Sequence, residues 1–80
     1  MKFDRLLDTQ GLTCPEPVIL LHNAVRDADV GQIIKVLATD PATERDIPRF
    51  CQFLKHPLMG SLRPEQNDEK LYIYYVKKIL

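Results

Sequence analysis

The chain has 80 residues, and its 11 basic residues balance its 11 acidic ones, giving a formal net charge of zero at pH 7. A chain of this length is expected to form one small domain over residues 1–80, with a core too small to enclose a deep active-site cavity. Zero net charge argues against stable, direct nucleic-acid binding, because such domains usually have a basic excess. No apolar run is long enough to span a bilayer, and no apolar segment follows the charged N-terminus, so we expect neither membrane insertion nor a secretion signal.

The first half of the chain predicts a βαβ unit. Residues 4–8 predict a short strand, and a helix is expected from Pro15 to about Ala28, with Gly31 as its C-terminal stop. The β-branched segment Gln32–Thr39 predicts a second strand, parallel to the first with a right-handed crossover. The apolar residues that recur at helical spacing are Val18, Leu21, Ala24, Val25 and Ala28.

A second helix is expected after a turn at Asp40–Arg45. Asp46 is predicted to cap it, with Pro48 tolerated in its first turn, and His56 is predicted to end it because Pro57 follows. Its predicted apolar face consists of Ile47, Phe50, Cys51 and Leu54.

The end of the chain predicts two further strands. Leu58 to about Pro64 is a weak candidate, residues 65–68 form a polar connection, and Glu69–Lys78 is the strongest strand of the chain. The expected fold class is therefore an α/β (α+β) two-layer sandwich of order βαβαββ, with two helices on one face of a mixed four-stranded sheet. The residues expected on the uncovered face are Ile33, Leu37, Tyr72 and Tyr74.

One cysteine lies where a loop should become a helix. Gly11 allows a turn, and Pro15 suits the first helical position, which would make Cys14 the N-cap residue beside free backbone N–H groups. The helix dipole favours a thiolate there, but Pro15 and Pro17 remove two donors and Glu16 adds negative charge, so only a modest lowering of the thiol pKa is expected. The prolines also stiffen the turn. Cys14 is thus a candidate nucleophile presented from an exposed loop, although an inert structural cysteine is the alternative.

The other candidate site residues have simpler interpretations. Cys51 is expected to pack in the core, and Pro17 occupies the position where a C-x-x-C motif would have its second cysteine, which disfavours redox cycling within one chain. The chain has four possible zinc ligands among its cysteines and histidines, namely Cys14, His22, Cys51 and His56. Their spacing matches no zinc motif, so we expect no metal and no cofactor. Two cysteines are too few for a disulfide scaffold and fit a reducing, cytoplasmic environment.

Three arginines are candidates for partner docking. Arg45 and Arg49 are four residues apart near the second helix, and Arg26 lies near the end of the first. A solvated helix face is the simpler explanation, and a docking patch for an acidic protein or an RNA backbone is the functional one.

Two blocks of the sequence resemble a known family. Leu7-Asp8-x-x-Gly11-Leu12-x-Cys14-Pro15-Glu16-Pro17 resembles the signature of the TusA family of sulfur carriers, also called SirA-like proteins. Asp40-Pro41-Ala42-Thr43-x-x-Asp46-Ile47-Pro48-x-Phe50-Cys51 is similar to the family's other characteristic stretch. The resemblance extends over nearly the whole chain and implies a two-layer βαβαββ sandwich.

The resemblance also implies a function for Cys14. In the family this cysteine accepts sulfane sulfur as a persulfide from a cysteine desulfurase and passes it to the next protein of a relay, which in TusA ends in 2-thiolation of the tRNA wobble uridine. We therefore expect a monomeric carrier with these two kinds of protein partner. A small thiol redox protein using Cys14 and Cys51, and a non-catalytic regulatory or binding module, are the alternatives.

Overall fold

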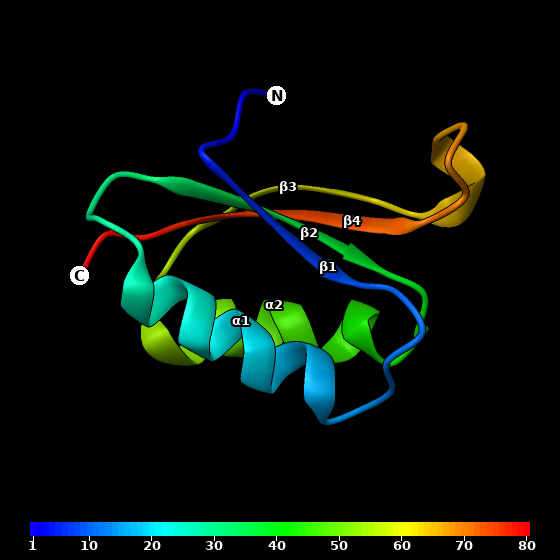
Figure 1. Ribbon diagram of the computed structural model, residues 1–80, viewed down its shortest axis with the longest axis horizontal. Coiled ribbons are helices and arrows are strands. Elements are labelled where there is room, and N and C mark those ends of the chain that lie inside the picture. The colour runs from blue at the N-terminus through cyan, green and yellow to red at the C-terminus, as the bar shows by residue number, and fades with distance from the viewer.

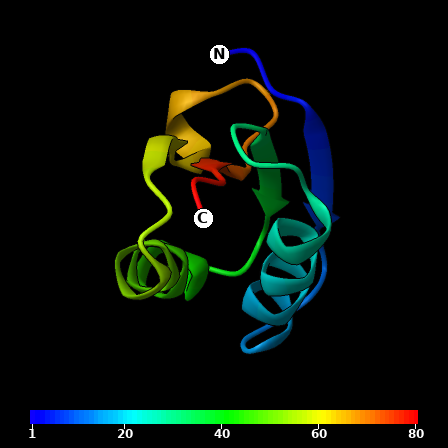
Figure 2. The ribbon, with the colours of Figure 1, turned by 90° about the vertical axis from the view of Figure 1, so that its left-hand side faces the viewer.

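Four strands and two helices follow one another in the order βαβαββ in the computed structural model, which describes residues 1–80. The elements are β1 (Arg5–Thr9), α1 (Glu16–Asp27), β2 (Ile33–Ala38), α2 (Thr43–Leu54), β3 (Leu58–Leu62), the 3-10 helix η1 (Pro64–Gln66) and β4 (Tyr72–Lys77). Both helices lie on one face of a single sheet (Figures 1 and 2), which confirms the predicted two-layer fold. No helix has the length and apolar character needed to cross a membrane.

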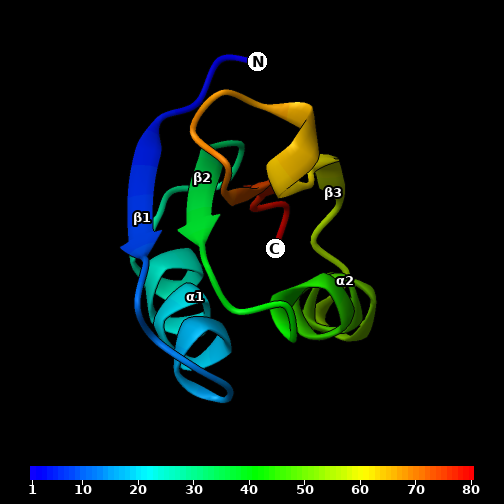
Figure 3. The ribbon, with the colours of Figure 1, turned by 90° about the vertical axis from the view of Figure 1, so that its right-hand side faces the viewer.

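The sheet has the strand order β1-β2-β4-β3. β1 and β2 are parallel, with Leu7 opposite Val36, whereas β4 is antiparallel to both of its neighbours. Because the carboxyl ends of parallel strands meet at the same edge, the loops that lead into α1 and α2 leave the sheet at one end (Figure 3). This end of the sheet contains the candidate site.

The main core lies between the sheet and the two helices. Alternate residues of each strand point into it, and each helix contributes one apolar stripe. Its buried members are Leu21, Val25, Ala28, Ile34, Val36, Ala38, Ile47, Phe50, Cys51, Tyr74 and Val76. The predicted core position of Cys51 is confirmed.

The uncovered face of the sheet has a smaller apolar cluster. Leu71, Ile73 and Tyr75 are buried there, with Ile33, Leu37 and Leu62 packed against them. The prediction was correct for Ile33 and Leu37 but wrong for Tyr72 and Tyr74, which pack on the helix side. Tyr74 pairs with Val36 and Tyr72 with Ala38, and paired residues share a face, so both tyrosines follow the core-facing residues of β2.

The second helix starts earlier than predicted, at Thr43 rather than after Asp46. The Asp40 side chain accepts the Ala42 N–H at 3.0 Å, and the Asp40 carbonyl accepts the Thr43 N–H at 3.0 Å, so Asp40 supports the helix start. Asp46 then falls in the first turn and Pro48 lies inside the helix rather than at its beginning. The helix ends as predicted before His56, with Lys55 in the left-handed region at φ 62°.

The first helix ends at Asp27, within one residue of the predicted end at about Ala28, but Gly31 is not its C-terminal stop. Ala28 follows its last residue in an extended conformation, and its N–H donates to the carbonyls of Ala24 and Val25. Gly31 instead adopts φ +93° in the turn before β2, a conformation that favours glycine.

Candidate functional site

Cys14 is exposed on the loop that joins β1 to α1. The N-cap residue of α1 is Pro15, so Cys14 precedes the cap and the prediction that it would be the cap itself is wrong. The Cys14–Pro15 peptide bond is cis. Pro17 is buried whereas Cys14 and Glu16 are exposed, so this turn anchors one proline in the protein and leaves the thiol outside.

Two contacts with the loop after β2 hold the Cys14 loop in place. The Cys14 N–H donates to Oδ2 of Asp40 at 2.7 Å, and the Gly11 N–H donates to Oγ1 of Thr39 at 2.9 Å. Gly11 has φ +83°, which lets the chain turn back toward this neighbouring loop. The other Asp40 oxygen binds the first turn of α2, so a single carboxylate connects the cysteine loop to the second helix.

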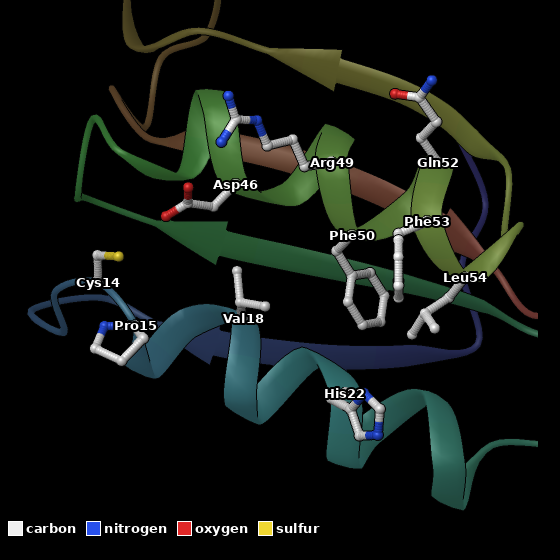
Figure 4. A pocket seen from close by; sticks show the side chains of 10 residues that line it. All are labelled: Cys14, Pro15, Val18, His22, Asp46, Arg49, Phe50, Gln52, Phe53 and Leu54. Carbon is white, nitrogen blue, oxygen red and sulfur yellow. The ribbon is translucent and has the colours of Figure 1, made fainter.

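Asp46 lies opposite Cys14 on the first turn of α2. Figure 4 shows its carboxylate directed toward the side of the site where the Cys14 sulfur lies. Nε of Arg45 donates to Oδ1 of Asp46 at 2.8 Å, which fixes one carboxylate oxygen. The Asp46 side chain is 17% exposed and that of Arg45 is 59% exposed, so the carboxylate is sheltered while its arginine partner faces water.

The charges around Cys14 reverse the expected direction of its pKa shift. The Asp46 carboxylate, which lies beside the thiol, raises the pKa of Cys14 most strongly, and partial desolvation and the negative charge of Asp40 raise it further. Arg45 opposes this increase. The helix start was expected to lower this pKa modestly, but the dipole effect is small at an exposed position and two neighbouring carboxylates outweigh it. Arg45, followed by Cys14, lowers the pKa of Asp46, so this carboxylate is ionised at neutral pH.

An open groove of about 900 Å³ runs from Cys14 between the two helices. Figure 4 shows Val18 and His22 of α1 on one side and aromatic residues of α2 on the other. The His22 and Phe50 rings meet edge to face with their centroids 6.0 Å apart. Phe53 lines the same groove although its ring is largely in solvent. The residues that line the groove are Cys14, Pro15, Val18, His22, Asp46, Arg49, Phe50, Gln52, Phe53 and Leu54.

The structure places the three candidate docking arginines in two regions. Arg45 and Arg49 both lie near Asp46, and Arg49 lines the groove. Arg26 lies in the last turn of α1, far along the helix from Cys14, where it pairs with Asp27 at 3.4 Å. The candidates therefore do not form one cluster.

The remaining titratable candidates lie away from Cys14. Burial raises the pKa of the Cys51 thiol to about 11, and Cys51 and Cys14 are both free thiols. His56 is buried, and its Nδ1 accepts the Ile79 N–H at 3.3 Å. No three histidine, cysteine, aspartate or glutamate side chains lie close enough together to hold a metal ion.

The roles of Asp40, Asp46 and Phe53 at this site are not evident from the sequence. Local pattern places Asp40 in a turn and Asp46 at a helix cap, and it indicates no site role for Phe53. One signal was available: Asp40 directly follows a strand expected to be parallel to β1, and the loops after parallel strands meet at one end of a sheet. No comparable signal placed Asp46 opposite the sulfur, because the predicted start of α2 was four residues late.

Together, the fold and the site define a small two-layer α/β protein that presents one exposed thiol at the mouth of an open groove. A sequence model of the TusA family, described as sulfurtransferase TusA, matches residues 5–78. The chain therefore belongs to the TusA family.

Relatives and a solved structure agree with this assignment. The chain is 51% identical over 75 residues to sulfur carrier protein TusA of Pseudomonas paraeruginosa (strain PA7), covering 94% of this chain and 90% of that protein. It is 49% identical over 75 residues to the protein of the same name from Pseudomonas entomophila (strain L48), covering 94% and 89%. The crystal structure of a SirA-like protein from Desulfitobacterium hafniense superimposes with a TM-score of 0.79 and 17% identity, covering 96% of this chain and 100% of that one. This similarity supports the fold.

Proposed function

We propose that this protein is a sulfur carrier and that Cys14 is its persulfide site. The observation that supports the proposal best is the exposed Cys14 thiol at the mouth of a groove, in a chain about half identical to proteins named sulfur carrier protein TusA. A carrier must bring its sulfur into the active site of another protein. An exposed thiol on a loop tied to a neighbouring helix meets that requirement, whereas a thiol in a closed pocket would not.

In the proposed reaction, Cys14 accepts sulfur from a persulfide on a cysteine desulfurase. The Cys14 thiolate attacks the terminal sulfur of the donor persulfide and forms a new S–S bond. The donor's S–S bond breaks, and its electron pair leaves with the donor cysteine as a thiolate, which takes up the equivalent of the proton lost by Cys14. Atoms and electrons balance without an outside oxidant or reductant, and delivery to the acceptor repeats the same exchange.

Protein partners are expected to dock on the groove. Its apolar residues Phe53 and Leu54 offer contact area, while Arg45 and Arg49 near Asp46 can pair with acidic residues of a partner. Arg26 belongs to a second candidate contact region at the far end of α1. We propose a cytoplasmic, monomeric carrier that engages a desulfurase and a downstream relay protein in turn, with no stable binding to nucleic acid and no cofactor.

The proposed destination of the sulfur is the 2-thio group of the tRNA wobble uridine. The protein supplies sulfur through its protein partners in this proposal, so the tRNA need not contact it. This part of the proposal rests on the family resemblance of the two sequence blocks around Cys14 and Asp40.

Intact mass spectrometry after incubation with a cysteine desulfurase and cysteine tests the proposal. The expected result is a gain of one sulfur atom that dithiothreitol removes, that Cys14→Ser abolishes and that Cys51→Ser retains. Absence of the adduct on a folded protein, or a Cys14–Cys51 disulfide in its place, would contradict sulfur carriage. Wobble 2-thiouridine is then measured in tRNA from a strain lacking the protein, where unchanged 2-thiouridine would overturn the tRNA assignment alone.

A further inference from the structure

The Asp46 carboxylate lies where its charge acts on the protonation of the Cys14 thiol. The two side chains come from different segments, Cys14 from the loop before α1 and Asp46 from the first turn of α2. They face each other at one end of the groove (Figure 4). Arg45 binds Oδ1 of Asp46, which leaves Oδ2 available to the thiol or to a partner. The start of α2 does not require an acid at position 46, because the Asp40 side chain already accepts the Ala42 N–H there.

We propose that Asp46 is a positioning residue that lowers the reactive thiolate fraction of the unloaded Cys14 until a docked partner pairs with the Asp46 carboxylate. The proposal rests on the proposed function of Cys14 as a sulfur carrier. The partner group would be a cation or a strong hydrogen-bond donor, since Oδ2 is an acceptor and the site is negatively charged on this side.

The charged groups that face Cys14 support this role. Asp46 and Arg45 on α2 and Asp40 on the preceding loop act on the sulfur, and the two carboxylates disfavour a thiolate while Arg45 favours it. The positive charge of Arg49 helps to lower the pKa of Asp46 and so favours its ionised form. His22 lines the same groove from α1. A partner that covered the groove without pairing with Asp46 would remove water from the sulfur and make the thiolate still less favourable.

This arrangement would give the carrier selectivity. A resting thiol reacts slowly with oxidants and with unrelated disulfides, because the thiolate is the reactive species. A persulfide is a stronger acid than a thiol, and its terminal sulfur lies one S–S bond, about 2 Å, beyond Sγ. Because the persulfide is the stronger acid, it stays more ionised at neutral pH than the empty thiol beside the same carboxylate, so Asp46 can restrain acceptance without preventing delivery.

The test is the pH dependence of alkylation of Cys14 by iodoacetamide, followed by intact mass in the absence of any desulfurase. Asp46→Asn is expected to raise the alkylation rate at pH 7 by about threefold or more. The curve of alkylation rate against pH is expected to move to lower pH. Asp46→Glu restores the charge and is expected to return the profile most of the way toward wild type. Asp27→Asn is the matched control, because Asp27 also pairs with the preceding arginine but lies at the opposite end of α1, roughly 16 Å along the helix axis.

Arg45→Gln gives a second, opposite prediction. It removes the cation that favours the Cys14 thiolate, so the alkylation rate at pH 7 is expected to fall below that of wild type. An unchanged or slower rate in folded Asp46→Asn, or an equal increase in Asp27→Asn, would overturn the proposal; if Asp46→Asn does not fold, a rate increase in Arg45→Gln would do so. The assay contains no sulfur donor, so its outcome is independent of whether a persulfide forms on Cys14.

Discussion

The backbone N–H of Cys14 donates a 2.7 Å hydrogen bond to Oδ2 of Asp40, a residue 26 positions later in the chain. The second oxygen of the same carboxylate accepts the Ala42 N–H at the start of α2. The position of the thiol is therefore set by a residue distant in sequence as well as by the proline-containing turn. Asp40 connects the cysteine loop to the helix that bears Asp46.

Asp40→Ala should loosen this connection. Two backbone N–H groups lose their acceptor, so we expect the free energy of unfolding to fall by about 1 kcal/mol in urea denaturation, as for loss of a helix cap. Amide hydrogen exchange at Cys14 should accelerate. Asp8→Ala is the control, because Asp8 accepts only the nearby, exposed Gln10 N–H and its loss should cost less than about 0.5 kcal/mol. Equal losses for the two variants would contradict the bridging role of Asp40.

Tyr74→Phe should destabilise the protein more than Tyr72→Phe. The Tyr74 hydroxyl and Oγ1 of Thr43 form a buried hydrogen bond of 2.9 Å, whereas Tyr72 is half-buried on the same face. Removing the Tyr74 hydroxyl is expected to cost about 1 kcal/mol in the free energy of unfolding, and Tyr72→Phe less than about 0.5 kcal/mol. Thermal and urea unfolding of both variants measure the difference. An unchanged free energy of unfolding in Tyr74→Phe would show that the Thr43–Tyr74 bond contributes no net stability.

Cys51 should make the protein less stable in alkaline solution. Burial raises its pKa from 9.0 to about 11, so between these pH values the unfolded chain releases a proton that the folded protein keeps. The unfolded state is then favoured, and stability falls as pH rises above about 9. Urea midpoints measured from pH 8 to pH 10 should fall more steeply for wild type than for Cys51→Ala. Identical slopes for the two proteins would rule out titration of Cys51 as the cause.

Phe53 should matter for transfer but not for folding. Its side chain is 84% exposed and lines the groove that begins at Cys14, so Phe53→Ser removes contact area available to a partner while removing almost nothing from the core. We expect sulfur transfer from a desulfurase to slow about fivefold or more, with the urea midpoint unchanged. Val30→Ser is the matched control, because Val30 is 67% exposed but does not line the groove. Equal transfer rates in the two variants would exclude Phe53 from the docking surface.

The order and type of the elements could be predicted from the sequence because they depend on local patterns. The helical spacing of apolar residues predicts α1 and α2, and the β-branched and aromatic segments predict β2 and β4, so the helix layer and the sheet layer both follow from local pattern. The faces of β4 were assigned incorrectly because both of its faces are apolar, so alternation alone does not say which one meets the helices. The pairing of Tyr74 with Val36 decides it, and that pairing is a long-range contact.

The site was predicted only in part for the same reason. Gly11, Pro15 and Pro17 indicated an exposed thiol at the start of a helix, and these are neighbours of Cys14 in sequence. The direction of the Cys14 pKa shift depends instead on Asp46 and Asp40, which reach the sulfur only after the chain has folded. In an isolated helix the dipole would favour the Cys14 thiolate, but in the folded protein the carboxylates of Asp46 and Asp40 oppose it.

The parallel pairing of β1 with β2 also has a mechanical consequence for the site. Thr9 ends β1 opposite Ala38, and each chain then continues directly into the loop that contains Cys14 or Asp40. A slip of one residue between the two strands would move these loops apart by about 3.3 Å, more than the length of the hydrogen bond between them. The same slip would turn Leu7 and its neighbours away from the core. The strand register thus sets the position of the thiol, and burial of one face of β1 in the hydrophobic core fixes that register.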